Sequence, residues 1–161
     1  MNKGKPPLVC IIIVNWNGGQ TTINCLESLR KTDYKNYKVI LVDNGSTDNS
    51  VEIIKKYDKL LKAGEYPIAC KGIDFRWWSE KDTGQSNAIN KGFRVAKGDV
   101  LAWLGSDDYY EVGALQKVQE IFTAHPELDL LYGGGFYNNE LNGKRIPVEN
   151  TPTSFEELRK G

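Results

Sequence analysis

Residues Val100 to Asp108 read VLAWLGSDD, an apolar run that ends in two adjacent carboxylates. An uninterrupted apolar run between Gly98 and Gly105 predicts a strand that is buried on both faces, as in a parallel sheet. Asp107 and Asp108 then stand at the carboxyl end of this strand, where open α/β sheets bind ligands. Because two neighbouring negative charges repel each other, we expect a cation or a donor-rich ligand beside them. Taken alone, the pair is more typical of a solvated turn or a helix cap.

Strand and helix patterns alternate on the amino-terminal side of this run. The expected strands are 8–14, 38–42, 75–79 and 100–104, and the expected helices lie around 23–29, 51–61 and 85–96. Repeated crossovers of this kind require a mostly parallel sheet with helices on both faces. The sequence therefore predicts a three-layer, Rossmann-like α/β fold.

The pattern changes on the carboxyl-terminal side. Apolar spacing predicts a helix around residues 115–122 and a short strand over 128–132. Residues 136–141 and 144–148 flank Asn142-Gly143, a strong signal for a β-hairpin, so an antiparallel piece is expected beside the parallel sheet. A capping box at Thr153 predicts the start of a further helix.

Length and composition bound the class of protein. The 161 residues are expected to form a single domain, residues 1–161, and no linker is apparent. With 21 basic and 21 acidic residues, no broad attraction to nucleic acid is indicated. Cys10, Cys25 and Cys70 are widely spaced, which favours reduced core thiols. The apolar segment after the basic start is too short for a signal peptide or a membrane span, so we expect a soluble, cytoplasmic protein.

Three loops should meet at the carboxyl edge of the sheet: 15–19, 43–48 and 105–110. Acidic and amide side chains dominate them, and neither a phosphate-binding loop nor a dinucleotide fingerprint follows the first strand. Carboxylates on a short loop suit Mg²⁺ or Mn²⁺, which completes its coordination with water and substrate phosphates. Asp43 is available to accept hydrogen bonds from a base or a ribose, or else to cap the following helix.

Four motifs give the chain a family resemblance. They are Val9–Asn17 (VCIIIVNWN), Leu41–Asp48 (LVDNGSTD), Ser79–Gly92 (SEKDTGQSNAINKG) and Trp103–Asp108 (WLGSDD). In this order and at about this spacing, they resemble the family 2 glycosyltransferases of the GT-A fold. The likeness runs through most of the chain rather than through one motif.

The resemblance implies a role for particular residues. Asn15 and Trp16 would form part of the nucleotide-base pocket, and Asp43 would hydrogen-bond the base. Asp107 would lie near the ribose or in the metal shell, and Asp108 would be the direct ligand of Mn²⁺ or Mg²⁺. That ion would bridge the diphosphate and stabilise the leaving nucleotide.

Three further residues in the third motif would lie on the sugar side of the pocket. The resemblance implies that Asp82 and Asn87 line this side and that Lys91 contacts a phosphate. For Asn87 and Lys91, an exposed helix face is the alternative. The aromatic side chains of Trp77, Trp78, Tyr109 and Tyr110 could stack on sugars, although aromatic residues at strand ends more often belong to the core.

The activity that the resemblance implies is the transfer of a sugar, with inversion, from a nucleotide diphosphate sugar to an acceptor hydroxyl. The expected donor is a UDP-sugar, and the expected acceptor is a carbohydrate or a lipid-linked group. Cell-surface polysaccharide biosynthesis and peripheral association with a membrane belong to the same expectation.

The chain departs from the family pattern in three places. Asn87 stands where many relatives have Asp, and Gly105 stands where a polar residue is common. The third departure concerns the acceptor base, which in this family lies in a later acidic segment. Nothing after Asp129 matches that segment, so we expect the chain to lack it. The acidic residues considered and left unassigned are Glu140, Glu149, Glu156 and Glu157.

Two other functions stay open at this point. The chain could be a truncated module that binds a nucleotide sugar and transfers nothing. It could also be a nucleotidyltransferase, but such enzymes hold a triphosphate with a glycine-rich and basic loop after the first strand. Residues 15–19 contain glycines and neither Lys nor Arg.

Overall fold

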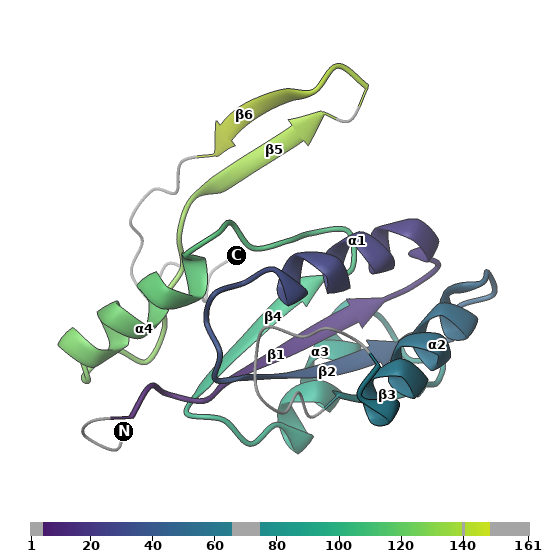
Figure 1. The fold of residues 1–161 in the computed structure, drawn as a ribbon, viewed down its shortest axis with the longest axis horizontal. Helices are drawn as coiled ribbons and strands as arrows, with labels where there is room; N and C mark the ends of the chain where they lie inside the picture. The colour runs from purple at the N-terminus through teal and green to yellow at the C-terminus, as the bar shows by residue number, and fades with distance from the viewer. Residues whose placement is uncertain (1–4, 66–74, 140, 149–161) are drawn as a thin grey trace. The chain divides into compact units, whose positions relative to one another are not determined.

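The structure is a computed structural model, and it describes residues 5–65, 75–139 and 141–148 (Figure 1). It divides into two compact units, residues 1–126 and 127–161. The first unit contains a parallel sheet with its helices, and the second contains a β-hairpin. That residues 1–161 form one domain stays a prediction.

The described elements follow the expected alternation of strands and helices. The strands are β1 (Val9–Asn15), β2 (Tyr37–Asp43), β3 (Phe75–Ser79), β4 (Val100–Gly105), β5 (Gly135–Asn139) and β6 (Lys144–Val148). The helices are α1 (Gly19–Arg30), α2 (Ser50–Ala63), α3 (Gln85–Val95) and α4 (Ala114–Ala124). The predicted α/β class, with a mostly parallel sheet and a separate antiparallel hairpin, is confirmed.

The main sheet has the order β3-β2-β1-β4, and its described strand pairs are all parallel. Asn15 pairs with Asp43, and Val14 pairs with Gly105. This register places the carboxyl ends of β1, β2 and β4 side by side. The loops that follow these strands are therefore held at one edge, where parallel sheets bind ligands.

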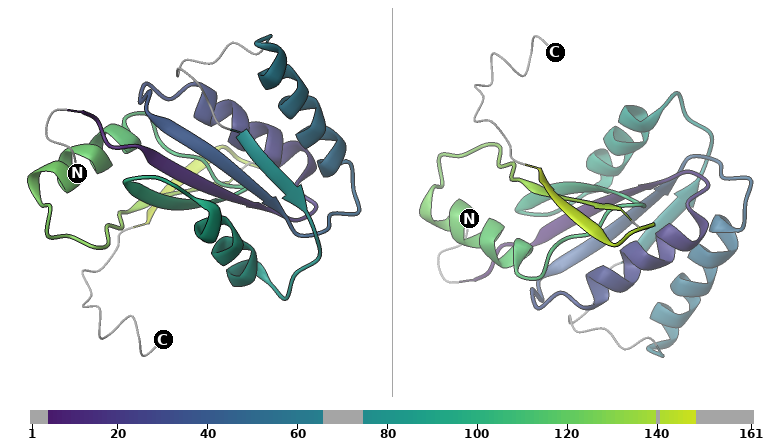
Figure 2. Two further views of the ribbon diagram at one scale, coloured as in Figure 1. Left: turned by 90° about the horizontal axis from the view of Figure 1, so that it is seen from below. Right: turned by 90° about the horizontal axis from the view of Figure 1, so that it is seen from above.

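The core forms because β1 is buried along its whole length and apolar from Val9 to Val14. Side chains alternate between the two faces of a strand. Cys10, Ile12 and Val14 pack on the face that carries Ala88 of α3, with Phe93 beside them. Helices α1 and α2 cover the opposite face, as both views in Figure 2 show. The three predicted layers are thus present.

Strand β4 differs from the prediction that both its faces are buried. Leu101 is 45% exposed and Trp103 is 56% exposed, whereas Val100 and Leu104 are buried. The reason is its position, because β4 is the last strand of the sheet and α3 packs over β1 and β2. An apolar run therefore does not distinguish a central strand from one at the edge.

The strand predicted over 128–132 is absent from the described structure. Residues 127–134 form neither helix nor strand, and Leu128 and Leu130 are exposed. A strand needs a partner for its backbone groups, and no described strand pairs with this segment. The alternating apolar residues of this segment were consequently misleading.

The predicted hairpin is present as β5 and β6, with a longer turn than expected. Asn139 pairs with Lys144, so the turn is not limited to Asn142-Gly143. Gly143 has a φ of +67°, which glycine adopts without strain. The helix predicted from Thr153 lies outside the described residues.

Two further expectations concern burial and membranes. Cys10 and Cys25 are buried thiols, as predicted, and Cys70 lies outside the described residues. Within the part of the chain that the structure describes, none of the helices has the length and apolarity that a membrane crossing requires.

The contact between α3 and β1 provides a test of the packing. A β-carbon on Gly92 would lie 2.8 Å from Ile12 Cγ1, and Ile12 Cγ2 would be closer still. Alanine in a helix is favoured over glycine by about 1 kcal/mol where space exists, but overpacking costs about 1–3 kcal/mol. We expect Gly92→Ala to lower the free energy of unfolding, measured by urea denaturation. The control is Gly133→Ala, which has open space around it. If Gly92→Ala is as stable as the wild type, α3 does not pack against Ile12 as closely as described.

Candidate functional site

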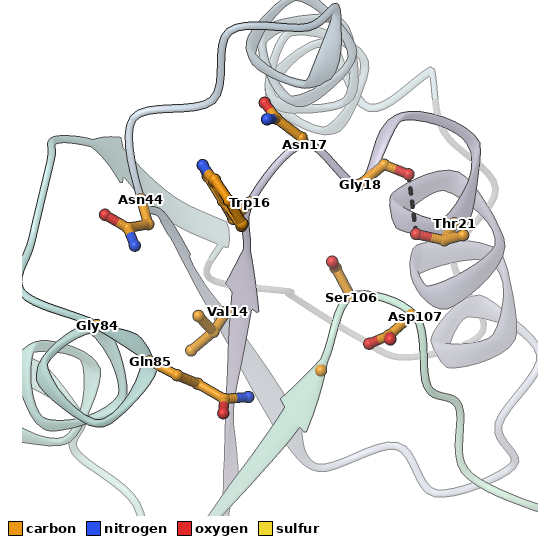
Figure 3. A pocket seen from close by; sticks show the side chains of 11 residues that line it. Val14, Trp16, Asn17, Gly18, Thr21, Asn44, Gly84, Gln85, Ser106 and Asp107 are labelled. Carbon is orange, nitrogen blue, oxygen red and sulfur yellow. Dashed lines mark hydrogen bonds between the residues drawn. The ribbon is translucent and has the colours of Figure 1, made fainter.

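A cleft lies at the carboxyl edge of the sheet, where β1, β2, β4 and the start of α3 meet (Figure 3). Its volume is about 690 Å³, which is within the range of small-molecule sites. The lining residues are Val14, Trp16, Asn17, Gly18, Thr21, Asn44, Gly84, Gln85, Gly105, Ser106 and Asp107. The loops that the sequence predicted to converge therefore do so around a hollow of ligand size.

A buried hydrogen-bond network lies beneath the cleft. Asn15, Thr22 and Asp43 are each 0% exposed. Asn15 Nδ2 donates to Asp43 Oδ1 at 2.7 Å, and Thr22 Oγ1 donates to Asn15 Oδ1 at 2.7 Å. The network thus ties α1 to the ends of β1 and β2, because buried polar groups require partners.

Asp43 is the charged centre of this network. Its Oδ1 also accepts a hydrogen bond from Ser46 Oγ, and its Oδ2 accepts hydrogen bonds from Ser46 N and Ser79 Oγ. Burial by itself raises the pKa of Asp43, but the hydrogen bonds from Ser46, Ser79 and Asn15 outweigh it and hold the pKa below its usual value. Asp43 is therefore a buried carboxylate that is stabilised in its charged form.

This geometry separates two of the predicted nucleotide contacts from the cleft. The two carboxylate oxygens offer about four accepting positions, and Asn15, Ser46 and Ser79 supply four donors to Asp43. Neither Asn15 nor Asp43 lines the cleft. Both residues are buried beneath the cleft, where they brace the loops, and their contact with a base stays a prediction.

Trp16 lines the cleft directly before a residue with an unusual backbone conformation. Asn17 has a φ of +52°, in the left-handed region that costs a non-glycine residue about 1 kcal/mol. Its N–H donates to Ser46 Oγ at 2.8 Å, and its Oδ1 accepts from Thr47 N at 2.8 Å. The loop after β2 therefore holds the turn after β1, which leaves Trp16 68% exposed at the cleft.

The β3–α3 loop forms the opposite wall. Asp82 N donates to Asn44 Oδ1 at 2.8 Å, and Asp82 Oδ1 accepts from Gly84 N at 2.9 Å. The Asp82 side chain is 0% exposed and lies behind the lining. Asp82 Oδ2 has no hydrogen-bond partner among the described residues. Asp82 therefore shapes the wall through Asn44 and Gly84.

Lys91 and Asn87 lie on α3, away from the lining. Lys91 Nζ lies 2.8 Å from Glu80 Oε1 and 4.0 Å from Asp82 Oδ2. The lysine is thus engaged by two carboxylates of its own chain. Asn87 is half-buried in the first turn of α3 and does not line the cleft.

Asp107 and Asp108 follow β4 on the other side of the cleft. Both are exposed, and Asp107 lines the cleft. Burial of its carboxyl group, and then the charge of Asp107, raise the pKa of Asp108. The described residues contain no group of three or more His, Cys, Asp or Glu side chains placed to hold a metal. A cation here would have the two aspartates as its protein ligands, which suits Mg²⁺ or Mn²⁺.

The four aromatic residues considered for sugar stacking differ in their surroundings. Trp78 packs against the core cluster, and Trp77 is half-buried. Tyr110 is also half-buried, whereas Tyr109 is 48% exposed beside Asp108. The core interpretation thus holds for Trp78.

Sequence reasoning missed several residues that line the cleft: Asn17, Asn44, Gln85 and Ser106. Each lies within or directly beside a motif that had been singled out. The signal that could have found them is their place directly after a strand or at the start of a helix, at the edge of the sheet where ligands bind. Asn44 beside Asp43 is the clearest case.

Taken together, a parallel sheet and a cleft lined by an exposed tryptophan and a carboxylate define a ligand-binding protein of the open α/β class. The profile of glycosyl transferase family 2 matches residues 10–160. The chain therefore belongs to this family.

Individual relatives agree with the family assignment. The chain is 29% identical over 140 residues to glycosyltransferase GlyG of Streptococcus pneumoniae, covering 84% of this chain and 42% of that protein. It is 32% identical over 128 residues to a PGL/p-HBAD biosynthesis glycosyltransferase of Mycobacterium tuberculosis, covering 79% of this chain and 46% of that protein. The chain thus spans less than half the length of these relatives.

Two solved structures share the fold. TarS 1-349 of S. aureus in complex with UDP-GlcNAc has a TM-score of 0.60 at 22% identity, covering 74% of this chain and 32% of that one. The mannosyltransferase PcManGT of Pyrobaculum calidifontis in complex with GDP-Man and Mn²⁺ has a TM-score of 0.61 at 19% identity, covering 81% and 35%. The GT-A fold that the resemblance implied is confirmed.

The buried carboxylate gives a pH-dependent prediction. Because the folded-state pKa of Asp43 is lowered, its contribution to stability is present above the unfolded-state pKa of about 3.9 and is lost as the pH falls through the folded-state pKa. We expect Asp43→Asn to lower the free energy of unfolding by about 1–3 kcal/mol at pH 7. The difference from the wild type should shrink as the pH falls below about 4.

Urea denaturation at a series of pH values measures this difference. Asp129→Asn, in an exposed segment, serves as the control and should stay within about 0.5 kcal/mol of the wild type. If the free energy of unfolding lost in Asp43→Asn stays constant with pH, the network does not stabilise the charge of Asp43.

Proposed function

We propose that this chain is the donor-binding part of a glycosyltransferase and that its cleft holds a nucleotide diphosphate sugar. The observation that carries the proposal is the cleft itself, with Trp16 and Asn44 at one end and Asp107 at the other. An aromatic face suits a nucleobase, and a pair of carboxylates suits a cation that accompanies a diphosphate. Structural neighbours solved with UDP-GlcNAc and with GDP-Man support this choice of ligand.

Trp16 is the residue that we assign to the base. Its exposed ring can stack on a heterocycle, and the braced turn at Asn17 reduces the entropy lost when it does so. Asn44 lies at the same end, with its oxygen already accepting from Asp82 N. Its amide hydrogens are therefore the groups that it presents to an acceptor atom of the nucleotide.

The middle of the cleft suits the diphosphate. Gly84 and Gln85 belong to the amino end of α3 and line the cleft, and Figure 3 shows the Gln85 side chain extending toward the end of β4. The amino end of a helix carries partial positive charge and unpaired N–H groups, which favours an anion. In this arrangement a phosphate lies between α3 and the carboxylates after β4.

Asp108 and Asp107 are the residues that we assign to the divalent cation, Mn²⁺ or Mg²⁺. A cation bound there would supply positive charge to stabilise the diphosphate as a leaving group. The two aspartates would hold the ion beside the diphosphate.

The reaction that we propose is transfer of the sugar to an acceptor hydroxyl with inversion, which needs a base on the face opposite the leaving group. We assign no described residue as this base. The four glutamates considered from the sequence all lie outside the described residues: Glu140, Glu149, Glu156 and Glu157. A carbohydrate or lipid-linked acceptor and peripheral association with a membrane belong to the same proposal. They rest on the family resemblance alone.

A binding module without turnover is the second candidate. The observation behind it is that none of the described residues is assigned as the acceptor base, whereas the cleft has groups suited to a nucleotide. Both candidates require nucleotide binding in the cleft, and only transfer of sugar distinguishes them. Donor hydrolysis and transfer assays with UDP-GlcNAc and GDP-Man therefore decide between them.

Isothermal calorimetry with UDP and GDP tests the nucleotide site. We expect Trp16→Ala to raise the dissociation constant for both nucleotides by about tenfold, because stacking on an aromatic ring contributes about 1–3 kcal/mol per base. The control is Tyr137→Ala, which removes an exposed aromatic side chain from the hairpin. If Trp16→Ala binds both nucleotides as tightly as the wild type, the base does not occupy this end of the cleft.

The same titration with and without Mn²⁺ tests the role of the carboxylates. We expect Mn²⁺ to strengthen nucleotide binding by the wild type and to have no effect on Asp108→Ala, because the ion then lacks its main protein ligand. Equal strengthening in both proteins would remove Asp108 from the metal site.

A further inference from the structure

A buried carboxylate lies behind the cleft wall that the β3–α3 loop forms. The Asp82 side chain is 0% exposed, and its Oδ1 accepts a hydrogen bond from Gly84 N at 2.9 Å. Its Oδ2 is buried too, and within the described ranges of the chain no donor lies at hydrogen-bond distance from it. This oxygen therefore has no hydrogen bond to replace the water that it has lost.

Lys91 supplies a positive charge beside this oxygen. Its Nζ lies 4.0 Å from Asp82 Oδ2 and 2.8 Å from Glu80 Oε1. Side chains on a helix tilt toward its amino end, so Lys91, in the second half of α3, reaches back to the loop before the helix. The Glu80 side chain is 54% exposed, whereas that of Asp82 is fully buried. Asp82 depends on the lysine more than Glu80 does, because water can solvate the charge of Glu80.

The loop that contains Asp82 places two groups at the cleft. Asp82 N donates to Asn44 Oδ1 at 2.8 Å, which leaves the amide hydrogens of Asn44 for a ligand. Asp82 Oδ1 holds Gly84 N at the start of α3. Figure 3 shows Asn44 and Gly84 on the same wall of the cleft. A shift of Asp82 would thus move both groups.

We propose that Lys91 is a positioning residue for the nucleotide, because its charge keeps the Asp82 carboxylate in the interior and thereby fixes the wall that carries Asn44 and Gly84. The inference rests on the proposed function, in which this cleft binds a nucleotide diphosphate. Without the lysine, the buried carboxylate loses its counter-charge, and the loop must shift to return Asp82 to water. Lys91 acts here through Asp82, unlike the phosphate contact that the resemblance implied.

A double-mutant cycle between Lys91 and Asp82 tests the inference. Tm and the dissociation constants for UDP and GDP are measured for the wild type, Lys91→Met, Asp82→Asn and the double variant, with calorimetry well below the lowest Tm. Methionine keeps an apolar stem and removes the charge. We expect Lys91→Met to lower the Tm by about 5 °C or more. It should raise both dissociation constants by about threefold to tenfold, the range that one lost hydrogen bond accounts for.

The Asp82→Asn background shows whether the two residues act together. Because asparagine carries no charge, adding Lys91→Met to Asp82→Asn should lower the Tm by less than about 2 °C and leave the dissociation constants unchanged. Lys91→Arg keeps the charge and should bind both nucleotides more tightly than Lys91→Met. The control is Lys117→Met, which breaks an exposed ion pair with Glu120 on α4 and should behave like the wild type.

Three results would overturn the inference. If Lys91→Met raises the dissociation constants by the same factor in the wild-type and Asp82→Asn backgrounds, the lysine contacts the nucleotide directly. If the Tm falls while nucleotide binding is unchanged, Lys91 stabilises the fold and positions nothing in the cleft. If the wild type binds neither UDP nor GDP, the proposed function fails, and Lys91 has no nucleotide site to position even where the Tm values still couple it to Asp82.

Discussion

The buried carboxylate of Asp43 is the constraint on which the rest of the site depends. A charge that is fully removed from water must be met by hydrogen-bond donors, or the fold loses several kcal/mol. Asn15 on β1, Ser46 in the following loop and Ser79 at the end of β3 supply those donors. Because the donors come from three segments, matching the charge also fixes where three strands end relative to one another.

This buried network fixes the positions of the exposed residues of the cleft. Ser46 bonds both to Asp43 and to Asn17, so the brace extends directly to the turn that presents Trp16. On the other wall, Asn44 follows Asp43 in the chain and is held by the backbone of Asp82. The site thus divides into buried residues that hold the backbone and exposed residues that are available to a ligand. Preorganisation of this kind lowers the entropy lost on binding.

The elements of the fold could be predicted because each has its own hydrophobic period and its own boundary residues, as in the apolar run of β1 or the Asn142-Gly143 turn of the hairpin. The residues of the site were harder. A motif identifies a polar residue at a strand end, but it does not say whether that residue faces the cleft or the core. For Asp43 the answer depends on Ser79, which is distant in sequence. For Leu101 and Trp103 it depends on which strand lies at the edge.

The exposed face of β4 has a consequence for how this chain behaves in solution. Among the described strands, β4 pairs with β1 on one side. Leu101 and Trp103 are exposed on the face of the sheet where α3 packs over β1 and β2. An uncovered sheet edge with apolar side chains is a template for a further strand and a route to aggregation. Within the described residues this liability lies along β4, apart from the ligand cleft at the ends of the strands.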